Sequence, residues 1–161
     1  MAADLKIDIT DSEWEIMRVL WTQKECTSND VIRILKEKMT WQPTTIKTLL
    51  ARLVKKDLVG TEKEGNRYRY RPLVSESESW EAATDSLFEH ICAQKMGRKI
   101  ASMIRDSKLS FADIEMLEET LKKKRQSAVA AIDCDCTPGQ CGCEPGTCSA
   151  TQITETPESL N

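Results

Sequence analysis

The chain has 161 residues, a formal net charge of −3 and seven cysteines. That length suits one domain, or one small domain with appended segments. The average charge does not suggest a nucleic-acid-binding protein, but the charge is unevenly distributed. Residues 41–73 contain eight Lys or Arg against three acidic residues, whereas residues 132–161 contain five acidic residues and no Lys or Arg. This asymmetry predicts a nucleic-acid-binding region followed by a chemically different tail.

Composition also argues against several classes of protein. The longest purely apolar run, residues 128–132, is far shorter than the ~20 residues needed to span a membrane. The first residues lack the apolar segment of a signal peptide, so we expect a cytosolic protein with no membrane partner. An enzyme is not expected, because the sequence shows one histidine and no phosphate loop or Ser/His/Asp grouping. In a reducing cytosol, clustered cysteines bind metal or carry out redox chemistry more often than they form structural disulfides.

Two capping motifs near the N-terminus predict two helices. Thr10 is followed three residues later by Glu13. Thr27 and Asp30 repeat that spacing, which lets side chain and backbone cap the helix start reciprocally. Apolar residues at helical spacing in both segments are expected to face a core. The stretch before Thr27 is expected to be extended, with Cys26 as a small buried residue.

Residues 43–56 predict a third helix, with Pro43 at its first position. One face is apolar, and the opposite face carries small, hydroxyl and basic side chains. Such side chains allow close approach to DNA, contacts to phosphates and contacts to base edges. The residues of this face are Thr44, Lys47, Thr48, Ala51 and Lys55, flanked by Thr45 and Arg52. The helix alone is equally compatible with an ordinary solvated face.

A basic hairpin follows this helix. Gly65 and Asn66 form a turn pair between two extended segments, which predicts a β-hairpin. Residues 67–71 alternate arginine with tyrosine, so the arginines share one face of the second arm. Three helices followed by a basic hairpin are typical of a winged helix-turn-helix, which we predict for residues 1–74. The third helix would enter the major groove and the hairpin would lie along the DNA backbone.

Residues 75–131 predict a helical region with too few residues to cover its own apolar faces. We expect helices over about 78–95 and 97–106 and a last helix capped by Ser110, extending to about residue 128. Small domains of this kind often complete a core by pairing with a second copy, which predicts a homodimer. A two-fold dimer would place two recognition helices on adjacent half-sites of double-stranded DNA. The predicted fold is therefore mainly α, with a small β-wing.

The tail over residues 132–161 carries a Cys-x-Cys-x4-Cys-x-Cys motif. Its cysteines are Cys134, Cys136, Cys141 and Cys143. Pro138 and Gly139 predict a turn that brings the two pairs together. Converging thiolates are soft ligands that favour Cu(I), Zn(II) or an iron–sulfur centre. The spacing is partly repeated toward Cys148, which is a candidate extra ligand, and the Thr-, Ser- and Glu-rich end is predicted to be disordered.

A second metal site, within the helices, is not expected. His90 and Cys92 both fall in the helix predicted over residues 78–95, and residues two apart on a helix point to different faces. We therefore interpret His90 as a surface or packing residue.

The sequence resembles a known family. Residues 11–21 (DSEWEIMRVLW), Trp41 and residues 45–56 (TIKTLLARLVKK) resemble the BlaI/MecI family of winged-helix repressors, and the resemblance extends from about residue 9 to 124. The cysteine motif is absent from the β-lactam-responsive members and is similar to the tail of copper-responsive, CopY-type repressors. The resemblance implies a homodimer on a palindromic operator of copper-efflux genes. It also implies that a Zn(II) form holds DNA and that Cu(I), handed over by a copper chaperone, displaces zinc and releases the operator.

The resemblance also implies roles for individual residues. It implies base-reading positions at Thr44, Thr45 and Thr48, backbone contacts near Ser28, Arg52, Arg67 and Tyr68, and metal ligation by the four cysteines of the motif. The β-lactam branch has an Asn-Phe bond that a sensor protease cuts. The corresponding place here is about Ser102-Met103, which weakens an interpretation based on proteolysis.

Two other interpretations stay open at this point. One is a β-lactam-type repressor that is inactivated by proteolysis and carries the cysteines incidentally. The other is a metal-storage or structural zinc protein whose basic hairpin has no sequence-specific role. Operator binding that is steeply salt-dependent and sequence-selective would separate these classes.

Overall fold

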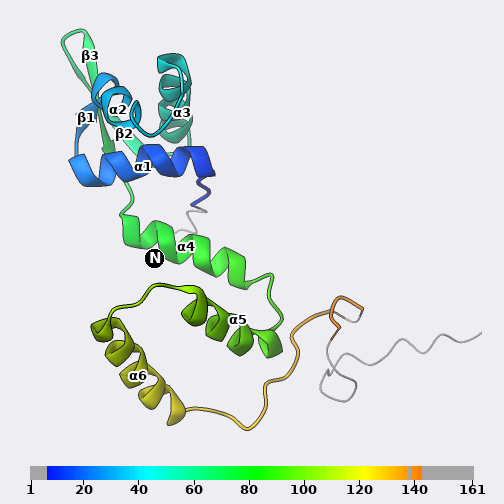
Figure 1. The fold of residues 1–161 in the computed structure, drawn as a ribbon. Helices are drawn as coiled ribbons and strands as arrows, with labels where there is room; N and C mark the ends of the chain where they lie inside the picture. Colours follow the sequence, from blue (N-terminus) through cyan, green and yellow to red (C-terminus); the bar gives the residue numbers. More distant parts are fainter. Residues whose placement is uncertain (1–6, 138, 143–161) are drawn as a thin grey trace, which may run out of the picture. The chain divides into compact units, whose positions relative to one another are not determined.

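The computed structural model describes residues 7–137 and 139–142 (Figure 1). Its elements are α1 (Asp11–Gln23), β1 (Cys26–Thr27), α2 (Ser28–Leu35), α3 (Pro43–Lys55), β2 (Val59–Glu64), β3 (Arg67–Pro72), α4 (Glu76–Phe88), α5 (Ala93–Asp106) and α6 (Phe111–Arg125). The described residues form two compact units, one ending at Ser86 and the other beginning at Leu87. Within the described part of the chain, no helix has the length and apolar character needed to cross a membrane.

The first unit groups α1, α2 and α3 beside an antiparallel sheet with the strand order β1-β3-β2 (Figure 1). Strands β2 and β3 form the predicted hairpin, in which Glu64 lies opposite Arg67. The turn needs Gly65, whose φ of 61° is a value that residues with a Cβ rarely adopt. Strand β1 adds to the other edge of β3, with Cys26 opposite Tyr70. The predicted winged helix-turn-helix is therefore confirmed.

Capping and core burial explain why these residues form these helices. Both predicted capping boxes form: the Thr10 N–H donates to the Glu13 carboxylate at 3.0 Å, and the Thr27 N–H donates to Asp30 at the same distance. The apolar faces of the three helices and the start of β2 meet in one core. That core includes Ile16, Met17, Leu20, Val31, Leu35, Ile46, Leu49, Leu50, Leu53, Leu58 and Val59. Burying the apolar face of α3 forces its hydroxyl and basic face outward.

The helix predicted over residues 78–95 was wrong, because the structure has two elements there. Helix α4 ends at Phe88, and Cys92 occupies the N-cap position of α5. The N–H of His90 donates to the carbonyl oxygen of Leu87 at 3.2 Å, a tightened bond typical of a terminating helix. Apolar residues at helical spacing continue past Phe88, so the end of the helix could not be recognised from the sequence. Cys92 therefore lies in a corner between two helices and not along one helix.

Helices α5 and α6 of the second unit leave apolar side chains exposed. Neither helix contains a buried residue. Their exposed large apolar residues are Ile100, Met103, Phe111, Ile114, Met116 and Leu121. Ser110 caps α6 as predicted, accepting a hydrogen bond from the Asp113 N–H at 3.2 Å, although the helix ends at Arg125 rather than near residue 128.

Candidate nucleic-acid interface and candidate metal centre

The outer face of α3 is the first candidate surface for binding DNA. The exposed residues of this face are Thr44, Thr45, Lys47, Thr48, Ala51, Arg52 and Lys55. The Thr48 hydroxyl donates back to the Thr44 carbonyl oxygen at 2.9 Å. Its oxygen can still accept a hydrogen bond, and its methyl group can contact a base. The face therefore offers small polar groups at its centre and cations on its flanks.

A hollow of about 340 Å³ lies between this face, α2 and the wing, which is the hairpin of β2 and β3. Its lining residues are Thr27, Ser28, Asn29, Lys47, Asn66, Arg67, Tyr68 and Tyr70. Tertiary structure thus brings Ser28, Lys47, Arg67 and Tyr68 together from three separate elements. The two cations face no acidic group among the described lining residues, so the hollow favours an anion such as a phosphate.

The three arginines of the wing differ in what they can offer to a ligand. The Arg69 guanidinium pairs with Glu64 and lies 3.7 Å from Glu25. The hydrogen bond and charge of Glu64 raise the pKa of Arg69 above its ordinary value. Among the described residues, no carboxylate lies within ion-pair distance of Arg67 or Arg71. The charges of these two arginines are therefore available to an anionic ligand.

A buried ion pair fixes α3 against α1. The Glu13 side chain is 1% exposed, and its carboxylate accepts hydrogen bonds from Lys56 Nζ at 2.7 Å and from the Thr10 N–H at 3.0 Å. Lys56 also donates to the Asp8 carbonyl oxygen at 2.9 Å. Burial raises the pKa of Glu13, but the hydrogen bonds from Lys56 and Thr10 outweigh it, and the net pKa lies below the ordinary value. The pair joins the first turn of α1 to the C-terminal end of α3.

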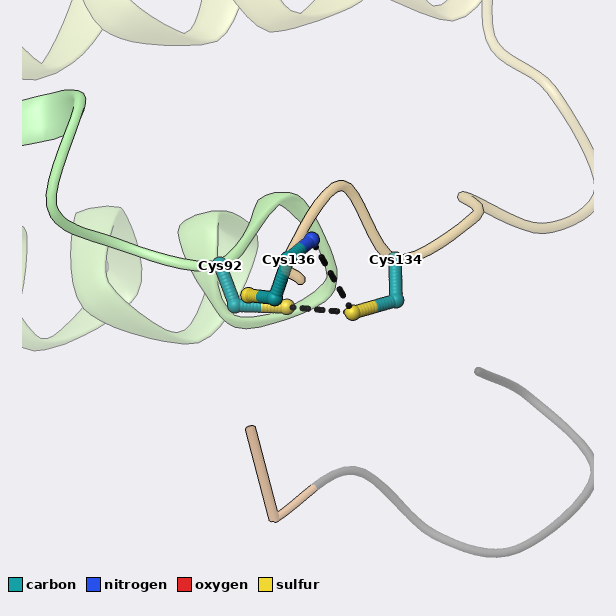
Figure 2. A group of neighbouring side chains, drawn as sticks. All are labelled: Cys92, Cys134 and Cys136. Carbon is teal, nitrogen blue, oxygen red and sulfur yellow. Dashed lines mark hydrogen bonds between the residues drawn. The ribbon is translucent and has the colours of Figure 1, made fainter. Parts of the chain in front are cut away.

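Three cysteines converge in the second unit, as Figure 2 shows. The Sγ atoms of Cys92, Cys134 and Cys136 all lie within 4.8 Å of one another. Cys92 Sγ lies 3.5 Å from Cys134 Sγ, and Cys141 Sγ lies 3.3 Å from Cys134 Sγ. Cys92 and Cys134 are both buried, whereas Cys136 and Cys141 are partly exposed. The group therefore has an enclosed side and an open side.

Two hydrogen bonds donated by backbone N–H groups hold the tail in this arrangement. The Ala93 N–H, at the start of α5, donates to the Asp135 carboxylate at 2.9 Å. The Gln140 N–H donates to the Thr137 carbonyl oxygen at 2.9 Å, and Gly139 has a φ of 86°. The hydrogen bond from Gln140 and the positive φ of Gly139 belong to the turn that was predicted between the two cysteine pairs.

The sulfur spacing suits a metal ion. Zinc–thiolate bonds of about 2.3 Å in a tetrahedron separate the sulfurs by about 3.8 Å, and the observed contacts of 3.3 and 3.5 Å are slightly shorter. Burial raises the pKa of Cys136, as do the neighbouring thiols Cys92 and Cys141. Crowded thiolates repel one another, and a bound cation reverses that repulsion. The cluster could therefore hold a metal ion.

The predicted motif and the observed cluster overlap but differ. The structure brings Cys134, Cys136 and Cys141 together, while Cys143 and Cys148 lie outside the described residues. Cys92, which we did not expect to join a metal site, is the residue that sequence reasoning missed. It is separated from Cys134 by 42 positions, and no spacing pattern connects them. His90 is exposed, as interpreted.

Comparison with known proteins identifies the family. The model of the penicillinase repressor family matches residues 9–123. The chain belongs to this family. It is a winged-helix, DNA-binding transcriptional repressor and not an enzyme. The cysteine motif lies beyond the residues that match the family model, whereas Cys92 lies within them.

Relatives are similar over most of this repressor. A 16.5 kDa protein of Latilactobacillus sakei, described as uncharacterized and named for the 3′ region of ptsI, is 47% identical over 133 residues, which are 83% of this chain and 91% of that protein. The penicillinase repressor of Bacillus licheniformis is 31% identical over 122 residues, 73% of this chain and 95% of that protein. The solution structure of the DNA-binding domain of the repressor BlaI is 41% identical, with a TM-score of 0.42, and the match covers 44% of this chain and 87% of that one.

Proposed function

We propose that this repressor responds to metal. A dimer in its Zn(II)-bound form binds a palindromic operator of copper-homeostasis genes, and exchange of zinc for Cu(I) at the tail releases the DNA. The observation that carries the proposal is a cluster of cysteines attached to the DNA-binding fold of this family. Binding to operator DNA would place the protein in the cytoplasm.

On the DNA side, Thr44, Thr45 and Thr48 read base edges from the major groove. Their small side chains let α3 approach closely, and threonine can contact either a base edge or a thymine methyl group. We assign contacts to the DNA backbone to the four predicted residues Ser28, Arg52, Arg67 and Tyr68 and also to Lys47. Four of these five line the hollow between α2, α3 and the wing, where a DNA phosphate would be held by positive charge.

The dimer would use the apolar surface of α5 and α6. Phe111 is 90% exposed, and the other apolar residues of these helices are also accessible. A single copy leaves this surface in water at a cost of roughly 25 cal/mol per Å² of apolar area. Pairing with a second copy would bury it and set the distance between the two recognition helices.

On the metal side, the proposed ligands are Cys134, Cys136, Cys141 and Cys143, with Cys148 as a candidate extra. Zinc accepts four thiolates in a tetrahedron and so links the two cysteine pairs. Thiolates also bind Cu(I), which is softer, and a copper chaperone could supply it. A metal shifts the DNA-binding equilibrium only by its different affinity for the two states of the protein. The two ions must therefore be held by differently arranged cysteines.

Joint measurement of DNA release and zinc release tests this function. A labelled operator would first be selected from random DNA by the zinc-loaded protein, and Cu(I) would then be titrated under reducing conditions. We expect DNA and zinc to be released together. A variant with serine at the four motif cysteines should not respond, whereas Cys26→Ser, which leaves the tail intact, should respond normally.

The other outcomes identify the rival functions. Tight operator binding that ignores copper would refute metal control and favour the proteolytic repressor. Absence of sequence-selective binding would refute the repressor function and leave a metal-binding tail on a helical protein.

A further inference from the structure

The tail motif does not contain all the cysteines of the cluster. We propose that Cys92 is a ligand of the metal ion held by the tail, so that the ion joins the tail to the corner between α4 and α5. This inference rests on the proposed metal binding by the tail. It adds a ligand from outside the motif, at the N-cap of α5 and within the residues that match the family model.

Among the described residues, the distances between sulfur atoms place Cys92 in the cluster with the tail cysteines. Cys92, Cys134 and Cys136 are the three cysteines whose Sγ atoms all lie within 4.8 Å of one another. Cys141 adjoins this group through its 3.3 Å contact with Cys134. These four sulfurs supply the number of thiolates that a tetrahedral zinc site uses, so Cys92 would take the fourth position that the motif alone assigns to Cys143.

Cys26 shows how a purely structural cysteine differs from Cys92. Cys26 is 4% exposed and belongs to the apolar core of the first unit. Cys92 is also buried, at 8% exposed, but it lies outside that core and its sulfur contacts the sulfur of Cys134. A buried cysteine that packs only as a small apolar residue is surrounded by apolar side chains, as Cys26 is. Cys92 instead lies beside a second sulfur. The surroundings of Cys92 are those of a ligand.

The start of α5 explains how the tail reaches Cys92. Cys92 is the N-cap residue, but its side chain makes no capping hydrogen bond. The tail supplies the cap instead, because the Asp135 carboxylate accepts the Ala93 N–H at 2.9 Å. A carboxylate at a helix N-terminus is favoured by both the unpaired N–H groups and the helix dipole. Asp135 lies between Cys134 and Cys136 in the sequence, so this hydrogen bond holds both thiols near Cys92. Asp135 therefore acts as a positioning residue.

Ligation by Cys92 has a consequence for the rest of the unit. A metal bound to both Cys92 and Cys134 closes a loop of chain that contains α5 and α6. The occupancy of the site then affects the ends of the two helices that we propose form the dimer. Cys-x-Cys pairs binding metal among themselves would leave these helices unconstrained.

Cobalt and zinc titrations of the full chain under reducing conditions test the proposal. Co(II) reports thiolate ligation through charge-transfer absorbance, and competition with a chromophoric chelator gives the Zn(II) affinity. Relative to wild type, Cys92→Ser should lower the absorbance per bound Co(II) by about one quarter of a four-thiolate site and weaken Zn(II) binding at least about tenfold. Cys26→Ser should change neither quantity. Asp135→Ala should weaken Zn(II) binding while leaving the absorbance per bound ion unchanged.

Alkylation of the unmodified wild-type protein gives a test that does not depend on the folding of a variant. Iodoacetamide labelling, mapped by mass spectrometry, should show that Cys92 is labelled more slowly in the Zn(II)-bound chain than in the metal-free chain. If Cys92→Ser matches wild type in both titrations, or if Zn(II) leaves the labelling of Cys92 unchanged while protecting the tail cysteines, this proposal fails and the proposed function stands. If the wild-type chain binds neither ion, both fail.

Discussion

Replacing Glu13 with Gln would test the ion pair that joins α1 to α3. The Glu13 carboxylate accepts hydrogen bonds from Lys56 at 2.7 Å and from the Thr10 N–H at 3.0 Å. Gln keeps the shape and one acceptor for the helix cap but removes the charge. Hydrogen bonds to charged groups contribute about 1.5–3 kcal/mol each, and Lys56 remains partly hydrated at 32% exposed. We therefore expect Glu13→Gln to lower the free energy of unfolding by about 2 kcal/mol at pH 7.

The partner substitution should be more damaging. Lys56→Met keeps the apolar stem but leaves the Glu13 carboxylate, which is 1% exposed, without its cation. Removing one partner of a buried pair typically costs about 3–5 kcal/mol. The double variant has no unpaired charge, so its loss should be smaller than the sum of the single losses by about 1–3 kcal/mol.

The effect of Glu13→Gln should depend on pH in a defined direction. The native pKa of Glu13 lies below its ordinary value, so the ionised form is favoured by folding. Its contribution is fully present above the unfolded-state pKa of about 4.3 and is lost as the pH falls through the lower native pKa. The difference between wild type and Glu13→Gln should therefore narrow as the solution is acidified below about pH 4.

Urea denaturation followed by tryptophan fluorescence measures these differences. All four tryptophans, Trp14, Trp21, Trp41 and Trp80, lie in the first unit, so the signal reports on that unit within the full chain. Glu62→Gln on the exposed face of the wing is the matched control and should change stability by less than about 0.5 kcal/mol. The reasoning is refuted if Glu13→Gln behaves like this control at pH 7, or if its effect does not change with pH.

Three further predictions concern other parts of the chain. Lys47→Ala should weaken operator binding about equally for all DNA sequences and reduce the salt slope by about 1; an unchanged slope in fluorescence anisotropy would remove Lys47 from the phosphate contacts. Burial raises the pKa of Cys26 to about 11, so mass mapping should find it unlabelled by iodoacetamide at pH 8 in the folded chain and labelled in urea. Phe111→Glu, at a side chain that is 90% exposed, should give a monomer in analytical ultracentrifugation without changing tryptophan-detected stability; a persistent dimer would exclude Phe111 from the interface.

Much of the first unit could be predicted because its signals are local. A capping box such as Thr10 with Glu13 acts across one helical turn, and Pro43 at a first helical position and Gly65 in a turn act over four residues or fewer. Amphipathic periodicity then determined which face of α3 would be exposed. The sequence could also predict that Cys134, Cys136 and Cys141 come together, because a short turn lies between the first two and the third.

Local signals could not show where α4 ends. Apolar residues at helical spacing continue through Ile91, and the residues that terminate the helix contain neither proline nor glycine. That error placed Cys92 inside a helix, two positions from His90, where the two side chains would have pointed apart.

The sequence by itself determined the class of protein: a basic winged helix, a helical region with uncovered apolar faces, and a tail of clustered cysteines. Tertiary structure decided which distant residues meet. Lys56 pairs with Glu13, and Arg67 of the wing lines the same hollow as Lys47. The contact of Asp135 with Ala93 places Cys134 beside Cys92. These contacts depend on the path of the whole chain, because no periodicity or spacing relates residues that are separated by several elements.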